Sequence, residues 1–247
     1  MTNDGIIKYS QQLIAEFSNR TPLYFNGFFL KYKDYIYFIT VSHGVTPDME
    51  QSKGVFLVLN ANDIGISTRV VQIRQWHFID LYEINANLHK FEFPTLSERV
   101  DFAFCEVDKG KFEKEIEQLP FMLNNAESPS CHHISFNLVK LPERVSLPAQ
   151  SHKYYVAGKK LRYINEARRE CYVLYYYDME YIGDYEGIHE FKIMQQTDGY
   201  TCEGLSGSPV FDENECLVGM ALRYRAEDNV LRVFSVDDII YYLKNDE

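Results

Sequence analysis

The sequence predicts an all-β protein built as a barrel or a sandwich, with a short helix near each end of the chain. Aromatic residues are dense, with 19 Tyr and 17 Phe among 247 residues, and the hydrophobic content of 46% is enough to fill a core. Apolar runs are short and separated by turn residues, which favours a barrel or sandwich over alternating strands and helices. No apolar run is long enough to cross a bilayer, so we expect no membrane partner.

The first expected element is an amphipathic helix within residues 1–20. Its apolar residues gather toward one face, namely Ile6, Ile7, Leu13, Ile14 and Phe17. The segment lacks the basic region, the continuous apolar stretch and the cleavage site of a secretory signal. We therefore expect a cytoplasmic protein.

Residues 21–110 are expected to form a first β domain. The stretch from Pro22 to Val45 is rich in aromatic and β-branched residues and breaks at Lys33 and Asp34, as two strands joined by a tight turn would. Further runs typical of strands follow in this half, namely "GVFLVLN", "TRVVQIRQW" and "VDFAFCEV".

A more polar and helical segment, residues 111–140, is expected to connect this domain to a second β domain, residues 141–247. The chain closes with a predicted helix, "DDIIYYLKN", whose Asp237 and Asp238 lie at the end favoured by the helix dipole. The strands of the second domain are expected at "KYYVAG", "CYVLYYYDMEYIG", "EFKIMQQ", "SPVF", "CLVGMALRYR" and "LRVFSV".

Charge, cysteine and histidine patterns exclude several classes of function. The net charge of −11 would repel nucleic acid, so we expect no nucleic-acid partner. Five cysteines is an odd number, which excludes a fully paired disulfide framework and favours a reducing compartment. His132 and His133 lie beside Cys131, but neighbouring strand residues point apart and no second ligand pair has suitable spacing, so we expect neither metal nor cofactor.

The stretch "TCEGLSGSPVF", from Thr201 to Phe211, raises the question of function. Gly204 and Gly207 enclose Ser206, which indicates a backbone that turns tightly or exposes its N–H groups. An ordinary hairpin turn would use the same residue types.

A nucleophilic serine needs a base, and the base needs an orienting acid. His43 follows the apolar run "YIYFIT", and Asp101 opens the run "DFAFCEV". His43 as a core histidine and Asp101 as a turn cap are alternative interpretations. His77 and Asp80, in "HFID", are further candidates for the base and the acid.

The order His43, Asp101, Ser206 and the segments around these residues resemble trypsin-like (chymotrypsin-fold) serine peptidases, in their disulfide-free bacterial or intracellular branch. "FITVSHGV" is similar to the family's strand before the histidine, "DFAFCEV" to its D-x-A-apolar strand, and "GLSGSPVF" to its G-x-S-G-x-P loop. "HFID" lacks this flanking pattern. The resemblance covers residues 23–243 and implies two antiparallel β-barrels with the active site between them.

The resemblance also implies roles for these residues. Ser206 would be the nucleophile, His43 the general base and acid, and Asp101 the group that orients the imidazole. The backbone N–H groups of Gly204 and Ser206 would form the oxyanion hole.

The sequence departs from the family pattern before the nucleophile and in the substrate pocket. Leu205 replaces an aspartate that pairs with a new N-terminus in digestive relatives, so activation would need another means, such as a protein partner. Tyr224 stands where many relatives have glycine, which predicts a narrow pocket and restricted specificity. By position, the substrate-binding residues are expected to be Tyr200, Thr201, Arg223, Tyr224 and Arg232. An arginine there would favour an acidic substrate side chain, although arginines on such strands are often only solvated.

The sequence therefore predicts a cytoplasmic serine endopeptidase that cleaves a protein or peptide substrate through an acyl-enzyme. A pseudoprotease that binds peptides without turnover, and an esterase or other acyl-transfer enzyme, are the alternatives. A narrower hypothesis is a bacterial effector protease in stress or phage defence, switched on by an activating protein partner.

Overall fold

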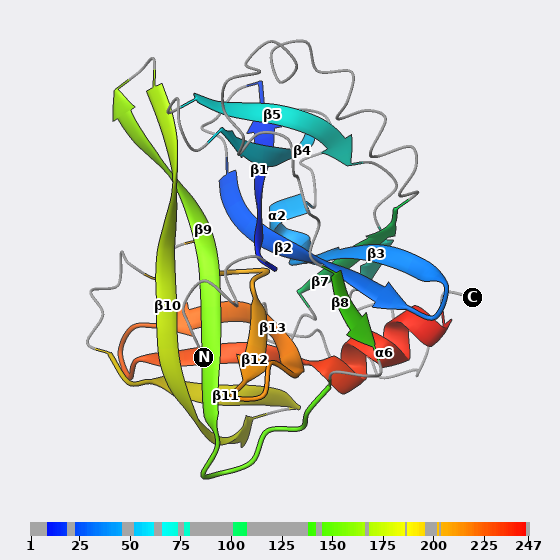
Figure 1. Ribbon diagram of the computed structural model, residues 1–247, viewed down its shortest axis with the longest axis vertical. Coiled ribbons are helices and arrows are strands. Elements are labelled where there is room, and N and C mark those ends of the chain that lie inside the picture. Colours follow the sequence, from blue (N-terminus) through cyan, green and yellow to red (C-terminus); the bar gives the residue numbers. More distant parts are fainter. Residues whose placement is uncertain are drawn as a thin grey trace, which may run out of the picture.

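The structure is a computed structural model that confirms the all-β prediction (Figure 1). Its described residues form fourteen strands and two helices. Among these residues, neither helix is long and apolar enough to span a membrane. The described residues are 9–18, 23–45, 52–61, 66–73, 77–79, 101–107, 138–141, 145–165, 168–185, 187–195, 202 and 204–245.

The first half of the chain forms one sheet with the strand order β5-β4-β1-β2-β3-β7-β6. Neighbours along this path are antiparallel, and β8 adds to β2 in parallel. The predicted turn at Lys33 and Asp34 is confirmed, because Tyr32 pairs with Tyr35 across it. The strands are β1 (Gln11–Phe17), β2 (Leu23–Tyr32), β3 (Tyr35–Thr40), β4 (Ser52–Ala61), β5 (Ile66–Ile73), β6 (His77–Ile79), β7 (Phe102–Glu106) and β8 (Leu138–Leu141).

The prediction of an N-terminal helix is wrong for residues 11–17, which form strand β1. This strand lies between β2 and β4, and Leu13, Ile14 and Ala15 are all buried. A strand covered on both faces has a continuous apolar run instead of an alternating pattern, and such a run resembles a buried helix segment. Residues 1–8 of the predicted helix lie outside the described residues.

The second half forms a closed barrel with the strand order β10-β11-β14-β13-β12-β9. The long β9–β10 hairpin continues beyond the barrel and reaches β5 of the first sheet (Figure 1). The barrel interior is filled by one cluster of apolar side chains, including Tyr154, Phe191, Leu205 and Val233. The strands are β9 (Lys153–Asn165), β10 (Arg168–Tyr185), β11 (Ile188–Ile193), β12 (Pro209–Asp212), β13 (Leu217–Arg225) and β14 (Val230–Ser235).

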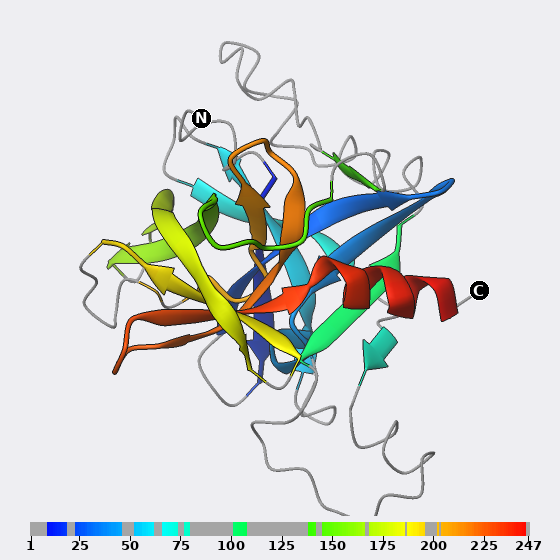
Figure 2. The same cartoon turned by 90° about the horizontal axis from the view of Figure 1, so that it is seen from below.

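The predicted C-terminal helix is confirmed as α6 (Val236–Asn245). Ser235 caps it, because the Asp238 N–H donates to Ser235 Oγ at 3.0 Å and that hydroxyl donates to Asp238 Oδ2 at 2.6 Å. The helix packs on β13 and β14 of the barrel and lies beside the first sheet (Figures 1 and 2), and its Ile239 and Leu243 join the core that contains Phe102. The two halves therefore share one hydrophobic core.

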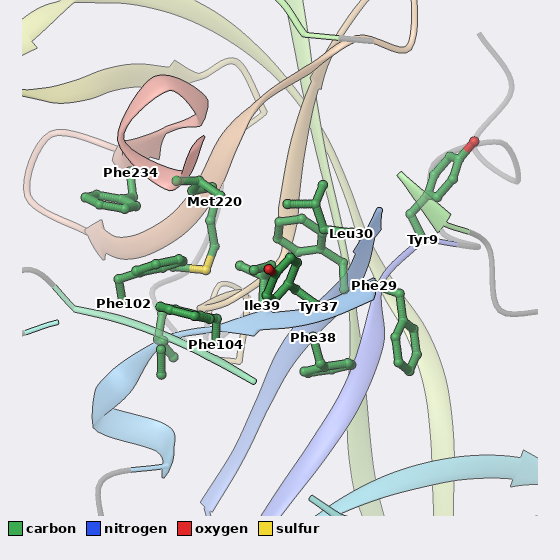
Figure 3. Close-up of a cluster of buried hydrophobic side chains, with 14 of the residues drawn as sticks. Tyr9, Phe29, Leu30, Tyr37, Phe38, Ile39, Phe102, Phe104, Met220 and Phe234 are labelled. Atoms are coloured by element: carbon green, nitrogen blue, oxygen red, sulfur yellow. The ribbon is translucent and has the colours of Figure 1, made fainter. Parts of the chain in front are cut away.

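That shared core is rich in aromatic side chains (Figure 3). The ring of Phe102, on β7, lies with its centroid 5.1 Å from that of Phe234, on β14, and 6.0 Å from that of Tyr242, on α6. Aromatic pairs at such distances contribute beyond the area that they bury. Phe102 directly follows Asp101, so this packing also fixes one end of the candidate site.

Candidate active site

His43 and Asp101 are brought together by the pairing of β3 with β7, in which Thr40 lies opposite Ala103. His43 lies in the single-turn helix α2 (Ser42–Val45), directly after β3, and Asp101 directly precedes β7. His43 Nδ1 hydrogen-bonds Asp101 Oδ2. Asp101 Oδ1 also accepts from the His43 backbone N–H at 2.8 Å and from Ser42 Oγ at 2.9 Å.

These contacts keep the Asp101 carboxyl group ionised. Burial alone would raise the pKa of this carboxyl group. The opposing effects are larger in sum: it accepts hydrogen bonds from the His43 ring, the His43 N–H and the Ser42 hydroxyl, and it is attracted to His43. The pKa of Asp101 therefore lies below the ordinary value. An ionised carboxylate can only accept, so Nδ1 carries the proton in the neutral imidazole. Nε2 is then the nitrogen that can accept a proton.

The Ser206 loop precedes β12 and is held against the barrel. The Gly207 N–H donates to the Ala221 carbonyl at 2.8 Å, and the Ala221 N–H returns a bond of 2.8 Å to the Ser208 carbonyl. Leu205, which stands where the resemblance leads us to expect an aspartate, is 1% exposed and packs into the barrel core. The buried Leu205 side chain therefore anchors this loop, and no ion pair at that position does so.

Both glycines of the loop adopt a backbone conformation that other residues rarely adopt. The φ angles are +86° at Gly204 and +84° at Gly207. A Cβ on Gly207 would lie 1.8 Å from the Asn26 carbonyl oxygen and 2.9 Å from Thr40 Oγ1. The loop thus passes tightly against β2 and the end of β3, three residues before His43.

Two N–H groups of the loop are unoccupied within the described part of the chain. The N–H groups of Leu205, Gly207 and Ser208 donate to the carbonyls of Cys202, Ala221 and Leu205. By contrast, the N–H groups of Gly204 and Ser206 have no acceptor among these residues. They are the two groups that the resemblance in sequence predicts to form an oxyanion hole.

The Ser206 hydroxyl does not bond to His43 in this structure. Ser206 Oγ donates to the Leu222 carbonyl on β13 at 2.8 Å. Within the described part of the chain, no hydrogen bond joins Ser206 to His43.

Asn26, on β2, is a residue of this site that the sequence did not reveal. Its side-chain N–H₂ donates to the Gly204 carbonyl, and its backbone N–H donates to the Ser206 carbonyl at 2.8 Å. The available signal was an amide in the middle of the apolar run "PLYFNGFFL".

The structure separates the residues predicted to bind substrate. Tyr200 and Thr201 lie outside the described residues. Arg223 is exposed and Tyr224 is half-buried, and both follow the Leu222 carbonyl that accepts from Ser206. The Tyr224 hydroxyl donates to Asn229 Oδ1 at 2.7 Å.

Arg232 lies on the outer face of the barrel, where it contacts Glu190 and Tyr185. Its neighbours Leu231 and Val233 are buried in the barrel core, so Arg232 lies on the outer face. There its Nε donates to Glu190 Oε1 at 3.0 Å, and its guanidinium lies 5.0 Å from the centroid of the Tyr185 ring. Among the described residues, this arginine therefore contacts Glu190 and the Tyr185 ring.

The other candidates from the sequence contribute no described side chains. His77 lies on β6, where only the backbone is described, and Asp80 and the pair His132 and His133 lie outside the described residues. Within the described ranges, no group of three or more His, Cys, Asp or Glu side chains is placed to hold a metal ion.

The sequence matches no protein-family model and no curated protein. Solved structures do resemble the fold. A mutant of tobacco etch virus protease has a TM-score of 0.52 at 13% identity, over 100% of this chain and 82% of that one. A Glu endopeptidase has a TM-score of 0.52 at 13% identity, over 99% and 95% of the two chains.

A serine endoprotease from Yersinia pestis has a TM-score of 0.53 at 7% identity, over 97% of this chain and 63% of that one. The three similarities cover nearly all of this chain and include both of its halves. The chain therefore has a chymotrypsin-like fold, with a closed second barrel and with His43 and Asp101 next to strands β3 and β7 of the first sheet.

Proposed function

We propose that the protein is a serine endopeptidase that uses Ser206, His43 and Asp101. The observation that carries this proposal is the state of the Ser206 loop. Its two positive-φ glycines surround a serine, and the N–H groups of Gly204 and Ser206 have no acceptor among the described residues. Such paired donors suit the negative oxygen that develops when a carbonyl is attacked.

The reaction follows from this arrangement. Ser206 Oγ leaves the Leu222 carbonyl, gives its proton to His43 Nε2 and bonds to the carbonyl carbon of the substrate. The carbonyl oxygen becomes an oxyanion held by the two N–H groups, and loss of one such donor costs on the order of a hundredfold in rate. Asp101 stabilises the imidazolium that forms at His43.

Two stages follow, the formation of an acyl-enzyme and its hydrolysis. His43 gives the proton to the leaving amine, the peptide C–N bond breaks, and an acyl group remains on Ser206. Water adds to this ester while His43 takes its proton. The bond between the acyl carbon and Ser206 Oγ then breaks, His43 gives the proton to Ser206 Oγ, and the acid product leaves. The three structural neighbours are called a protease, a Glu endopeptidase and a serine endoprotease, which supports this class of reaction.

The proposal includes restricted specificity. Tyr224 lies two residues after Leu222 on β13, and its hydroxyl is held by Asn229 Oδ1 at 2.7 Å. Asn229 Nδ2 also donates to the Ile193 carbonyl at 2.7 Å, which joins β11 to the β13–β14 turn. Arg223 is the remaining described arginine of the predicted pocket with an exposed side chain, so any preference for acidic substrates would depend on it.

The proposal also includes regulation by a protein partner in a bacterial cytoplasm. Ser206 has to leave the Leu222 carbonyl before it can act, and a partner that contacts the loop would favour that rotation. The three cysteines whose side chains are described, Cys105, Cys202 and Cys216, form no disulfide bond, which suits a reducing compartment.

A second candidate function is a pseudoprotease that binds peptides without cleaving them. The observation that favours it is the bond from Ser206 Oγ to Leu222, which leaves the serine away from its base. A permanent bond of this kind would leave a folded cleft without a nucleophile.

Labelling with a fluorophosphonate probe separates the two functions. A competent site should form an adduct at Ser206, located by mass spectrometry, and both Ser206→Ala and His43→Ala should abolish it. Ser208→Ala is the matched control, because this neighbouring serine is buried and its hydroxyl has no hydrogen-bond partner among the described residues. Absence of the adduct from folded protein, with or without candidate partners, would favour the pseudoprotease.

A further inference from the structure

We propose that Asn26 positions the oxyanion-binding groups of the Ser206 loop, an inference that rests on the proposed peptidase function. Asn26 is a residue of the first sheet, yet it bonds the loop carried by the second barrel at two points. Its side-chain N–H₂ donates to the Gly204 carbonyl, and its backbone N–H donates to the Ser206 carbonyl. The two bonded residues are those whose N–H groups are unoccupied in the described structure.

The burial of Asn26 indicates that its amide is present for these bonds. The residue is 0% exposed and lies on β2 among buried apolar residues, including Phe25 and Phe28. Burying an amide costs free energy unless every polar group is satisfied. Here the side-chain oxygen accepts from Ser10 Oγ at 3.0 Å, and the backbone carbonyl accepts from Thr40 Oγ1 at 2.6 Å.

The backbone at Gly204 depends on this hydrogen bond because side-chain packing of the described residues does not fix its conformation. Among the described residues, a Cβ at this position would have a single neighbour within 4 Å, the Tyr24 carbonyl oxygen at 3.9 Å. A glycine in open space can rotate about φ and ψ at little cost. The bond from Asn26 Nδ2 fixes the peptide unit between Gly204 and Leu205. This unit lies between the two peptide units that carry the Gly204 and Ser206 N–H groups, so the bond limits the rotation of both.

Ser10 sets the orientation of the amide. Its hydroxyl, also 0% exposed, donates to Asn26 Oδ1, so the N–H₂ end of the amide must face Gly204. Ser10 directly precedes β1. A chain of hydrogen bonds thus runs from the start of β1, through Asn26, to the loop with the nucleophile.

Asn26 is accordingly a positioning residue, and its loss should slow acylation without weakening probe binding. Asn26→Leu keeps the backbone N–H and the approximate size but deletes the amide. We expect its maximal rate of fluorophosphonate labelling at Ser206 to fall roughly tenfold to a hundredfold. The probe concentration that gives half the maximal rate should stay at the wild-type value.

Two further variants complete the experiment. Thr40→Val is the matched control, because it deletes a buried hydrogen bond to the Asn26 backbone that does not involve Gly204, and it should label at nearly the wild-type rate. Ser10→Ala removes only the hydroxyl that orients the amide, and it should slow labelling by a smaller factor than Asn26→Leu. The thermal unfolding midpoint of each variant establishes that it is folded.

A folded Asn26→Leu that labels at the wild-type rate would overturn the inference. If Asn26→Leu does not fold, Ser10→Ala decides, and an unchanged labelling rate there would overturn it equally. Wild-type protein that fails to label at Ser206 would instead refute the proposed peptidase function, and the inference would fall with it. The wild-type measurement therefore distinguishes the two failures.

Discussion

Replacing Gly207 with alanine should disrupt the contact between the Ser206 loop and the first sheet. Gly207 has a φ of +84°, and an added Cβ would lie 1.8 Å from the Asn26 carbonyl oxygen and 2.7 Å from its carbonyl carbon. Cβ atoms essentially never approach closer than 3.0 Å, so the loop and β2 would have to separate by at least the difference, 1.2 Å. Because the obstructing atoms are backbone atoms of a paired strand, no side-chain rotation relieves the clash.

The expected loss in the free energy of unfolding is about 3 to 4 kcal/mol. An alanine in the left-handed region costs about 1 to 2 kcal/mol by itself. A separation of more than 1 Å also breaks the two hydrogen bonds from Asn26 to the carbonyls of Gly204 and Ser206, each with a net contribution of about 1 kcal/mol. This sum is a large part of the total stability of an ordinary domain.

Equilibrium unfolding in urea measures the effect, and Gly187→Ala is its matched control. Gly187 has a nearly equal φ of +78°, but a Cβ there would meet nothing within 4 Å among the described residues. It should therefore lose only the backbone cost, about 1 to 2 kcal/mol. Equal losses for the two variants would refute the close approach of the loop to Asn26.

Three further predictions concern charge, thiol reactivity and packing. The pKa of Asp101 is lowered in the folded state, so its stabilisation is complete above the ordinary value of 3.8 and is lost as pH falls through the folded-state pKa. Thermal melts below about pH 4 should show a steeper loss for wild type than for Asp101→Asn, and parallel curves would contradict this. Iodoacetamide should alkylate half-buried Cys216 in native protein long before Cys105, whose burial raises its thiol pKa to about 12; site-resolved mass spectrometry would expose the opposite order. Leu205→Asp buries an unpaired carboxyl group and should destabilise by about 3 kcal/mol in urea unfolding, whereas unchanged stability would indicate a cationic partner for that position.

The sequence predicted the parts of the fold that depend on local patterns. The turn at Lys33 and Asp34 interrupts an aromatic run, and the C-terminal helix has acidic residues in its first turn. The sequence also placed His43 after one strand and Asp101 before another. Their contact depends on the pairing of β3 with β7, which brings together residues 58 positions apart. The motif indicated this pairing through its resemblance to a known arrangement, because local propensity contains no information about strand neighbours.

Features that depend on tertiary contacts could not be predicted from the sequence. The β1 segment reads as helix or strand until its neighbours β2 and β4 are known. The direction of Arg232 depends on the strand register, which pairs it with Glu190 on the outer face. Asn26 is an isolated polar residue in an apolar run, and only its approach to the Ser206 loop explains it.

Two sets of contacts hold the halves of the molecule together on either side of the candidate site. At one side, Asn26 bonds the loop that carries Ser206. At the other side, Phe102, next to Asp101, packs against Phe234 at the end of the second barrel (Figure 3). A relative movement of the two halves would have to break the buried hydrogen bonds or separate the packed rings, and close-packed interiors resist such small shifts.

Regulation of the proposed activity is therefore better served by rotation of Ser206 away from the Leu222 carbonyl than by movement of the barrels. A partner acting in this way would need to contact only the loop and the neighbouring edge of β13.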